Sequence, residues 1–339
     1  MKSRMAVVRT AGRAELVERD VALPDEGQVL IAIKACSICG GDLHIYKGKH
    51  PSAPLPTALG HELAGEVVAV GRKVRSVTPG DRVTVEPVIA CGECLPCRRG
   101  DYGYCDRLSF HYREGQGAMA DYFVAEERFV YKLPVHLSYE AGALIEPLSV
   151  AVHAVRRAGI GLGDKVVIIG AGPIGLLIAA VCKSAGAEDI LVGDIAEARL
   201  AKASLMGATM TIDGRKESMA EAVRRLSGGR GIDKSFECVG TEATFEQAMQ
   251  CLRKGGTATI LGIFEEPVIR IPATLFVSQE IIVQGSQGYC GDFETALGLT
   301  GVIDLGALVS HVFDLADVDK ALKVALNPEE SPVKVVLRP

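Results

Sequence analysis

The sequence lacks tryptophan, and aromatic residues make up only 5% of its 339 residues. It also lacks a basic block, because 37 lysines and arginines are outnumbered by 42 aspartates and glutamates, for a net charge of −5. Without a basic block or basic residues interleaved with aromatic ones, nothing indicates a nucleic-acid partner. The 48% of hydrophobic and 23% of charged residues are ordinary for globular proteins, and the length suffices for two domains of ~100–200 residues.

Long hydrophobic runs are missing as well. Residues 1–15 are charged and contain no continuous apolar stretch, so no signal peptide is expected. The uncharged run 166–182 is interrupted by Gly170, Gly172, Pro173 and Gly175, and it is shorter than the ~20 residues that a membrane helix needs. We therefore expect a buried strand and helix there, no membrane partner and a cytoplasmic protein.

Cysteine, in contrast, is plentiful. Ten cysteines without a secretory signal favour a reducing compartment and metal binding over disulfides. Six of them lie between Cys36 and Cys105, and the other four, interpreted as core residues, are Cys182, Cys238, Cys251 and Cys290.

The hydrophobic pattern predicts an α/β protein with two domains. Up to residue 149, short β-type runs such as 29–33, 66–70 and 82–85 alternate with turns, which predicts a mainly β domain, a distorted barrel. From residue 164, strand candidates at 166–169, 190–192, 234–237 and 257–261 alternate with helical patterns, which predicts a parallel sheet covered on both faces. A helix at 315–326 and a strand at 333–337 are expected to return to the first domain.

A glycine-rich turn predicts a dinucleotide site. The candidate strand 166–169 runs directly into Gly170-Ala171-Gly172-Pro173-Ile174-Gly175 and then into an apolar helix. The three glycines allow a tight turn, a close approach of the pyrophosphate and close helix–strand packing, and the free N–H groups of the helix start bind phosphate.

Asp194, nineteen residues after Gly175, lies at the end of the second strand and favours NAD over NADP. A carboxylate there accepts hydrogen bonds from the adenosine ribose and repels a 2′-phosphate. Arg199 is a further cofactor-binding candidate. The alternative is that Asp194 only caps the next helix and that Arg199 lies on a solvated face.

Four cysteines, Cys91, Cys94, Cys97 and Cys105, form a Cys-x2-Cys-x2-Cys-x7-Cys loop. Four thiolates this close can surround one tetrahedral ion, and a closed all-sulfur site indicates structural zinc. Disulfides are the alternative, but cysteines spaced so closely rarely pair without strain.

Three further pieces carry metal-ligating side chains. They are Cys39-Gly40-Gly41-Asp42-Leu43-His44, Gly60-His61-Glu62 and Glu146-Pro147-Leu148-Ser149. A thiolate, an imidazole and a carboxylate, completed by water, make an open zinc site, but spacing alone does not join these pieces.

With these motifs the sequence resembles the zinc-containing medium-chain dehydrogenases, and among them the sorbitol (polyol) dehydrogenase branch. The resemblance extends through Ala143-Leu144-Ile145-Glu146-Pro147-Leu148-Ser149-Val150 and Cys238-Val239-Gly240 and covers nearly the whole chain. It implies a GroES-like β-barrel catalytic domain of residues 1–149 and 287–339, split by a Rossmann NAD-binding domain of residues 150–286.

The resemblance also implies a catalytic zinc, so that two zinc ions per chain are expected. Cys39 and His61 are implied as its ligands, Glu62 as third ligand or near neighbour, and Glu146 as another ligand or a hydrogen-bond partner of the water. Asp42 would orient His61 without binding the zinc itself. Glu146, where liver-type alcohol dehydrogenases have cysteine, favours polyol and threonine dehydrogenases.

Two departures from the family pattern affect the expected chemistry. Gly41 replaces the usual Ser or Thr whose hydroxyl passes the substrate proton outward, so we expect a water-mediated relay toward His44, with Glu146 as the alternative acceptor. Gly288-Tyr289 replaces an Arg-Tyr pair of the sorbitol branch, which disfavours sorbitol itself. The substrate candidates are Tyr46, His111 and Tyr289.

The resulting expectation is an NAD-dependent zinc oxidoreductase that oxidises a secondary hydroxyl of a small polyol or sugar-derived alcohol to a ketone. A threonine- or butanediol-type dehydrogenase is the first alternative. A non-catalytic nucleotide-binding protein is the second, disfavoured because it has no need of an open zinc site. By analogy with relatives, a homo-oligomer, a dimer or tetramer, is expected.

Overall fold

The computed structural model describes all residues from Met1 to Pro339. The chain divides into two compact units: unit 1 comprises Met1–Glu146 and Cys290–Pro339, and unit 2 comprises Pro147–Tyr289. These limits lie within four residues of the expected 149/150 and 286/287 boundaries. The tail belongs to unit 1, where the last strand pairs with a strand of the N-terminal part.

Unit 1 is mainly β, and its largest sheet has seven strands. Its strands are β1 (Lys2–Thr10), β2 (Arg13–Asp20), β3 (Gln28–Ser37), β4 (Thr57–Ala58), β5 (Glu62–Val70), β6 (Arg82–Val85), β7 (Val88–Ile89), β8 (Ser109–Phe110), β9 (Tyr122–Glu126), β10 (Val130–Lys132), β17 (Val309–Asp314) and β18 (Lys334–Arg338). Its helices are α1 (Gly40–Tyr46), α2 (Leu95–Arg98), α3 (Tyr139–Ala143), α10 (Phe293–Leu299) and α11 (Val318–Leu326), with the 3-10 turns η1 (Tyr102–Tyr104), η2 (Glu127–Phe129), η3 (Gly306–Leu308), η4 (Leu315–Asp317) and η5 (Pro328–Glu330).

Strand β3 organises unit 1 because it pairs with β5, β9 and β18. Its pairing with β5 shifts register twice, between Leu30 and Ile31 and between Ile33 and Ala35. Such bulges bend a strand and increase its twist, which lets one long strand serve several neighbours around a curved sheet. The alternating apolar side chains of β3 and β5, including Ile31, Leu63 and Val67, enter the main core of the unit.

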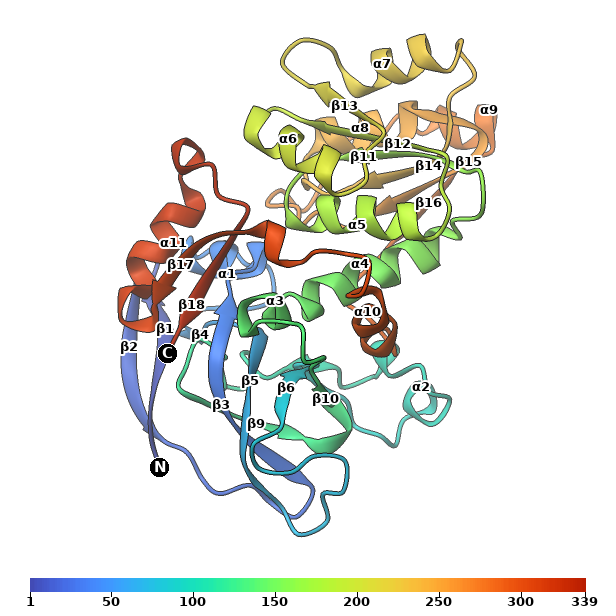
Figure 1. Cartoon of the computed structure of the whole chain (residues 1–339). Coiled ribbons are helices and arrows are strands. Elements are labelled where there is room, and N and C mark those ends of the chain that lie inside the picture. Colours follow the sequence, from blue (N-terminus) through green and yellow to red (C-terminus); the bar gives the residue numbers. More distant parts are fainter. The chain divides into compact units, whose positions relative to one another are not determined.

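Unit 2 is a six-stranded parallel sheet with helices on both faces (Figure 1). Its strands are β11 (Lys165–Ile169), β12 (Asp189–Asp194), β13 (Met210–Asp213), β14 (Ile232–Glu237), β15 (Leu252–Ile260) and β16 (Ile282–Gly285). Its helices are α5 (Pro173–Ser184), α6 (Glu197–Leu205), α7 (Met219–Leu226), α8 (Glu242–Gln250) and α9 (Thr274–Gln279), while α4 (Ile145–Ala158) crosses the unit boundary.

The strand order β13-β12-β11-β14-β15-β16 is that of a dinucleotide-binding Rossmann sheet, with its switch point between β11 and β14. Side chains of β11 alternate between the two faces: Val167 and Ile169 pack in a cluster with residues of α7 and α8, and Ile168 faces Gly175 of α5. The α/β fold class predicted from sequence is therefore confirmed.

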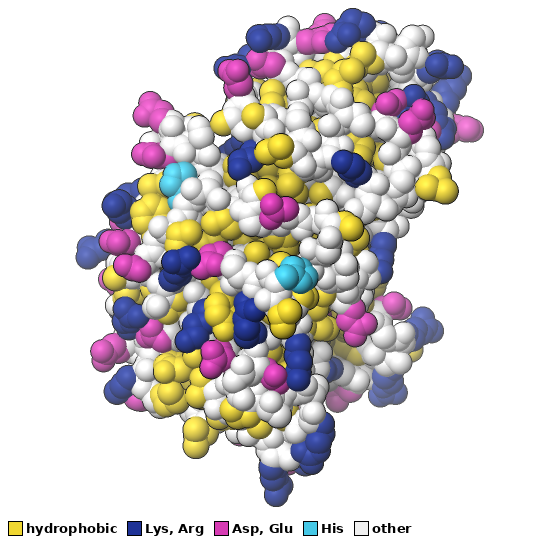
Figure 2. All heavy atoms as spheres, viewed as in Figure 1, with side chains coloured by type: hydrophobic (Ala, Val, Ile, Leu, Met, Phe, Trp, Pro, Cys, Tyr) yellow, Lys and Arg dark blue, Asp and Glu magenta, His cyan; other side chains and the backbone are white.

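Lys and Arg are interspersed with Asp and Glu over the face shown in Figure 2. No helix of the protein is long and apolar enough to cross a membrane, and the run 166–182 forms β11 and α5.

Candidate active site and nucleotide site

Strand pairing brings Cys39, His61 and Glu62 together. Ser37, the last residue of β3, pairs with Glu62, the first residue of β5, so Cys39 follows one strand at the point where His61 precedes the other. One ligand atom of each of the three side chains lies within 4.8 Å of the others. A sulfur, a nitrogen and an oxygen converging at this spacing fit a zinc ion that retains an open position.

Asp42 ties the two ligand-bearing segments together. Its fully buried carboxylate accepts hydrogen bonds from the backbone N–H of Cys39 and from that of Gly60, both at 2.9 Å. The carboxylate Oδ1 also lies 3.9 Å from Nδ1 of His61. Asp42 therefore fixes the backbone on both sides of the site and adds negative charge beside the imidazole.

Glu62 is held by a cation that the sequence analysis did not anticipate. Lys334 Nζ donates to Glu62 Oε1 at 2.6 Å and also contacts Oε2, which accepts a hydrogen bond from the Ser37 hydroxyl. Both charged side chains are almost completely buried, and Lys334 also donates to the carbonyl of Ile38 at 3.2 Å. The sequence signal that could have revealed this pair is the lysine within the apolar run of β18, since buried lysines are almost always paired with an opposite charge.

Negative charge dominates the electrostatics of this site. Burial opposes protonation of His61, but the neighbouring Cys39 and Asp42, with a contribution from Glu146, raise its pKa well above the usual value. Glu146 is 4% exposed in the first turn of α4, and its charge also acts on Lys334. A region that attracts a proton this strongly also attracts a divalent cation.

The predicted relay and substrate residues, His44, Tyr46, His111 and Tyr289, lie in different surroundings. His44 lies in the last turn of α1, and Tyr289 is 3% exposed at the end of unit 2. The Tyr46 hydroxyl instead donates to the Gly12 carbonyl at 2.6 Å and to Asp319 at 3.0 Å. His111 has its Nδ1 3.0 Å from the Gln116 amide and its ring against Phe123.

Tyr46 and His111 thus have structural partners, and other side chains border the zinc-ligand candidates. The ring of Tyr112 lies 5.4 Å from that of His61, and His50 lies 6.5 Å from Tyr112 between ring centroids. Burial, followed by the charges of Arg113, His44 and His61, lowers the pKa of His50 to about 4. Neither His50 nor Tyr112 belongs to a sequence motif.

The four sulfurs of Cys91, Cys94, Cys97 and Cys105 lie within 4.8 Å of one another. The 3.9 Å between Cys91 and Cys97 is close to the ~3.8 Å edge of a tetrahedron with ~2.3 Å zinc–sulfur bonds. Backbone N–H groups of Cys94 and Glu93 lower the pKa of Cys91 to about 6, which favours the thiolate. All ten cysteines are free of disulfides.

The glycine turn and Asp194 border a cavity of about 480 Å³ in unit 2. Gly170 has φ +101°, and a Cβ at Gly175 would lie 1.9 Å from the carbonyl oxygen of Gly170. A Cβ at Gly172 would meet nothing, and as N-cap of α5 this residue leaves the first N–H groups of the helix uncapped. The turn has the shape and the donors that a pyrophosphate needs.

Asp194 faces this cavity in a fixed orientation. Its Oδ2 accepts from the backbone N–H of Ala171 at 2.7 Å and its Oδ1 from that of Ala196 at 2.8 Å, while Arg199 lies 4.0 Å away. Arg215, held by Asp213 through two hydrogen bonds, is a lining residue that the sequence analysis did not name.

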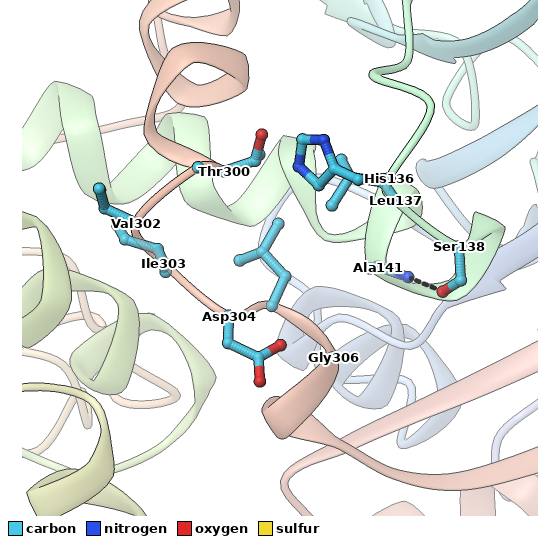
Figure 3. A pocket seen from close by; sticks show the side chains of 11 residues that line it. His136, Leu137, Ser138, Ala141, Thr300, Val302, Ile303, Asp304 and Gly306 are labelled. Atoms are coloured by element: carbon cyan, nitrogen blue, oxygen red, sulfur yellow. Dashed lines mark hydrogen bonds between the residues drawn. The ribbon is translucent and has the colours of Figure 1, made fainter.

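A second cavity, of about 450 Å³, lies in unit 1 between the α3 segment and the loop after α10 (Figure 3). His136 and Asp304 come from opposite sides of it, and both are exposed. The Ser138 hydroxyl accepts from the N–H of Ala141 at the start of α3. Its polar groups have local structural roles or face solvent, so this cavity lacks the convergent donors of a ligand site.

Comparisons with known proteins match both units. Residues 25–135 match the alcohol dehydrogenase GroES-like domain, and residues 173–301 match the zinc-binding dehydrogenase family. Sorbitol dehydrogenase of Bacillus subtilis is 34% identical, over 96% of this chain and 94% of the relative. L-arabinitol 4-dehydrogenase of Aureobasidium melanogenum is 37% identical, over 92% and 87%. The crystal structure of 2R,3R-butanediol dehydrogenase from Bacillus subtilis superimposes with a TM-score of 0.90 at 33% identity, over 99% of each chain.

Proposed function

Because the chain belongs to the zinc-type alcohol dehydrogenase family, we propose that it oxidises a secondary hydroxyl of a small polyol or sugar-derived alcohol to a ketone, with hydride transfer to NAD. The observation that carries the proposal is the convergence of Cys39, His61 and Glu62 within 4.8 Å in a chain that also has a complete dinucleotide turn. A non-catalytic nucleotide-binding protein has no use for such an open donor set.

Cys39, His61 and Glu62 would hold the catalytic zinc, and the four-cysteine loop a second, structural zinc. Bound there, the catalytic ion supplies a Lewis acid for the substrate oxygen. The chain's own residues orient the site: Asp42 fixes the backbone of Cys39 and Gly60, and Lys334 fixes the Glu62 carboxylate. We propose that His44 accepts the substrate proton through a water molecule beside Gly41. The carboxylate of Glu146 is the alternative acceptor.

A substrate panel with NAD tests the proposal. We expect kcat/KM for a tetritol, pentitol, hexitol or cyclitol to exceed that for long aliphatic alcohols, with sorbitol itself a modest substrate. The butanediol-type alternative, favoured by the structural match to that enzyme, predicts butane-2,3-diol as the best substrate. Turnover of aliphatic alcohols without any polyol activity would contradict the proposal.

NAD preference is proposed on the basis of Asp194, whose carboxylate is fixed at the glycine turn. Asp194→Gly should narrow the ratio of kcat/KM for NAD to that for NADP, because the group that repels a 2′-phosphate is removed. Arg199→Ala serves as the companion variant for the cation that lies beside Asp194. Equal use of both cofactors by the unmodified enzyme would argue against the assignment.

We also propose a cytoplasmic homo-oligomer. Ten cysteines without a disulfide suit a reducing compartment. Ile282 is exposed in the edge strand β16 of the unit 2 sheet, and the chain segment before it exposes Val268, Ile271 and Val277; these are apolar side chains that a second copy would cover.

A further inference from the structure

His50 borders the space that Gly41 leaves open. A Cβ built on Gly41 would lie 3.8 Å from Cys39 Sγ and 4.0 Å from His50 Nε2, with no other atom within 4 Å apart from its chain neighbours and the backbone of α1. The space therefore has a proposed zinc ligand on one side and an imidazole nitrogen on the other. A substrate group that enters this space would lie close to His50 Nε2.

The hydrogen bonding of His50 determines whether Nε2 is a donor or an acceptor. The backbone N–H of Ser52 donates to His50 Nδ1 at 3.2 Å. Because Nδ1 acts as an acceptor, the proton of the neutral ring lies on Nε2. His50 thus presents an N–H donor, with no acceptor recorded for it in the structure, to the space beside Gly41.

Arg113 holds this arrangement in place. Its Nη2 donates to the Ser52 hydroxyl at 2.8 Å and its Nε to the Tyr112 hydroxyl at 3.3 Å. Its guanidinium lies 5.6 Å from the centre of the Tyr112 ring, and that ring lies against His61. The segment that carries His50 is therefore anchored to the same aromatic side chain that contacts a zinc-ligand candidate.

We propose that His50 Nε2 donates a hydrogen bond to a second substrate oxygen, the hydroxyl next to the one that is oxidised. His50 is then a specificity residue that selects vicinal diols and polyols over alcohols with a single hydroxyl. The proposal rests on the proposed function, since the reacting hydroxyl must lie at Cys39 and His61. An alcohol with a single hydroxyl leaves the His50 donor unpaired. A site that hydrogen-bonds a substrate hydroxyl disfavours substrates that lack this hydroxyl.

Butane-2,3-diol and butan-2-ol test this, because they differ only in the second hydroxyl. We expect His50→Leu to lower the ratio of their kcat/KM values about tenfold, the effect of one hydrogen bond of ordinary strength. His50→Gln places an amide N–H near the position of Nε2 and should keep most of the preference. His311→Leu, at a histidine that stacks on Phe313 in β17, is the matched control and should leave the ratio unchanged.

Gly41→Ser provides a second, independent variant. Its backbone is not in the left-handed region, and its Cβ makes only ordinary contacts, so the serine should fit. Its hydroxyl would accept from His50 Nε2 and compete with the diol, so the ratio should fall here too. Circular dichroism and thermal melting establish that each variant is folded.

Three outcomes are distinct. A diol preference that is lost in His50→Leu and Gly41→Ser supports the proposal. A wild-type preference that both folded variants retain overturns the role of His50 and leaves the proposed function intact. A wild-type enzyme that oxidises neither diols nor polyols overturns the proposed function, and the role of His50 with it.

Discussion

Lys334 carries a positive charge into the apolar strand β18, where it is balanced by Glu62. Breaking a buried pair leaves one uncompensated charge, which costs more than an exposed pair contributes. We expect Lys334→Met to lower the free energy of unfolding by about 3–5 kcal/mol, measured by urea denaturation. The exposed pair Lys2–Asp20 is the control, and Lys2→Met should change stability by less than about 1 kcal/mol. Equal effects of the two variants would contradict this account.

Glu86 is a second buried carboxylate, and it makes stability depend on pH. It is fully buried beside Tyr102, Tyr131, Asp292 and Arg128, and burial raises its pKa to about 7. Because the folded state holds this proton more tightly than the unfolded chain, stability should fall as pH rises from about 4.5 to 7, by about 3 kcal/mol, and stay low above it.

Glu86→Gln keeps the shape of the side chain and removes its titration. The variant should match the wild type near pH 5 and exceed it in stability at pH 8, as measured by urea denaturation at both values. If wild-type stability instead rises between pH 5 and 7, and Glu86→Gln gives no gain in stability at pH 8, then the ionised form of Glu86 does not destabilise the folded state.

At the scale of elements, the four-cysteine loop and the β3–β5 pairing have separable roles. Cys97→Ser should lower the thermal stability because it opens the closed four-sulfur set, and residual turnover should persist at low temperature. Cys39→Ser should abolish turnover and leave the melting temperature little changed. Zinc content by atomic emission distinguishes them further, with about two ions per chain in wild type and one lost in each variant. A single ion in carefully prepared wild type would contradict the two-site proposal.

How far the elements could be predicted depended on their burial. Two largely buried strands were predicted close to their bounds: β11 at 166–169, which is a continuous apolar run, and β6 at 82–85. The two edge strands of the same sheet, β13 and β16, were missed because they are short and half exposed, so their hydrophobic pattern is weak. The predicted helix at 315–326 is in fact a 3-10 turn, η4, followed by α11.

The residues of the candidate site also differ in how far the sequence predicts them. Residues within local motifs, such as the four cysteines and the glycine turn, lie where spacing placed them. His50, Tyr112 and Lys334 reach the site only through tertiary packing, and no local spacing connects positions up to 295 residues from Cys39. For the same reason the hydrogen bond of the Tyr46 hydroxyl to Asp319, which is 273 residues away, could not be predicted from local spacing.

At the scale of the whole molecule, the proposed homo-oligomer would form through the edge of the unit 2 sheet. Strand β16 is the last strand of its sheet, so one side of its backbone has no strand partner, and Ile282 is 56% and nearby Val277 85% exposed. Native proteins usually protect such an edge with charge, proline or a covering element. Two copies related by a twofold axis would each present the same edge and the same apolar side chains, which gives a closed assembly.

Ile282→Lys places a charge at the first residue of that edge strand and should convert the proposed oligomer to monomers. Light scattering coupled to size exclusion, over a hundredfold range of protein concentration, measures the change in mass. Val312→Lys, at a 42% exposed valine on β17 of unit 1, adds the same charge away from the edge and should leave the mass unchanged. An unmodified chain that is monomeric at every concentration would contradict the assembly, whereas an oligomer that survives Ile282→Lys would place its interface on another surface. Because Ile282 lies outside the candidate active site, turnover by the Ile282→Lys monomer would further show whether each chain is catalytically complete.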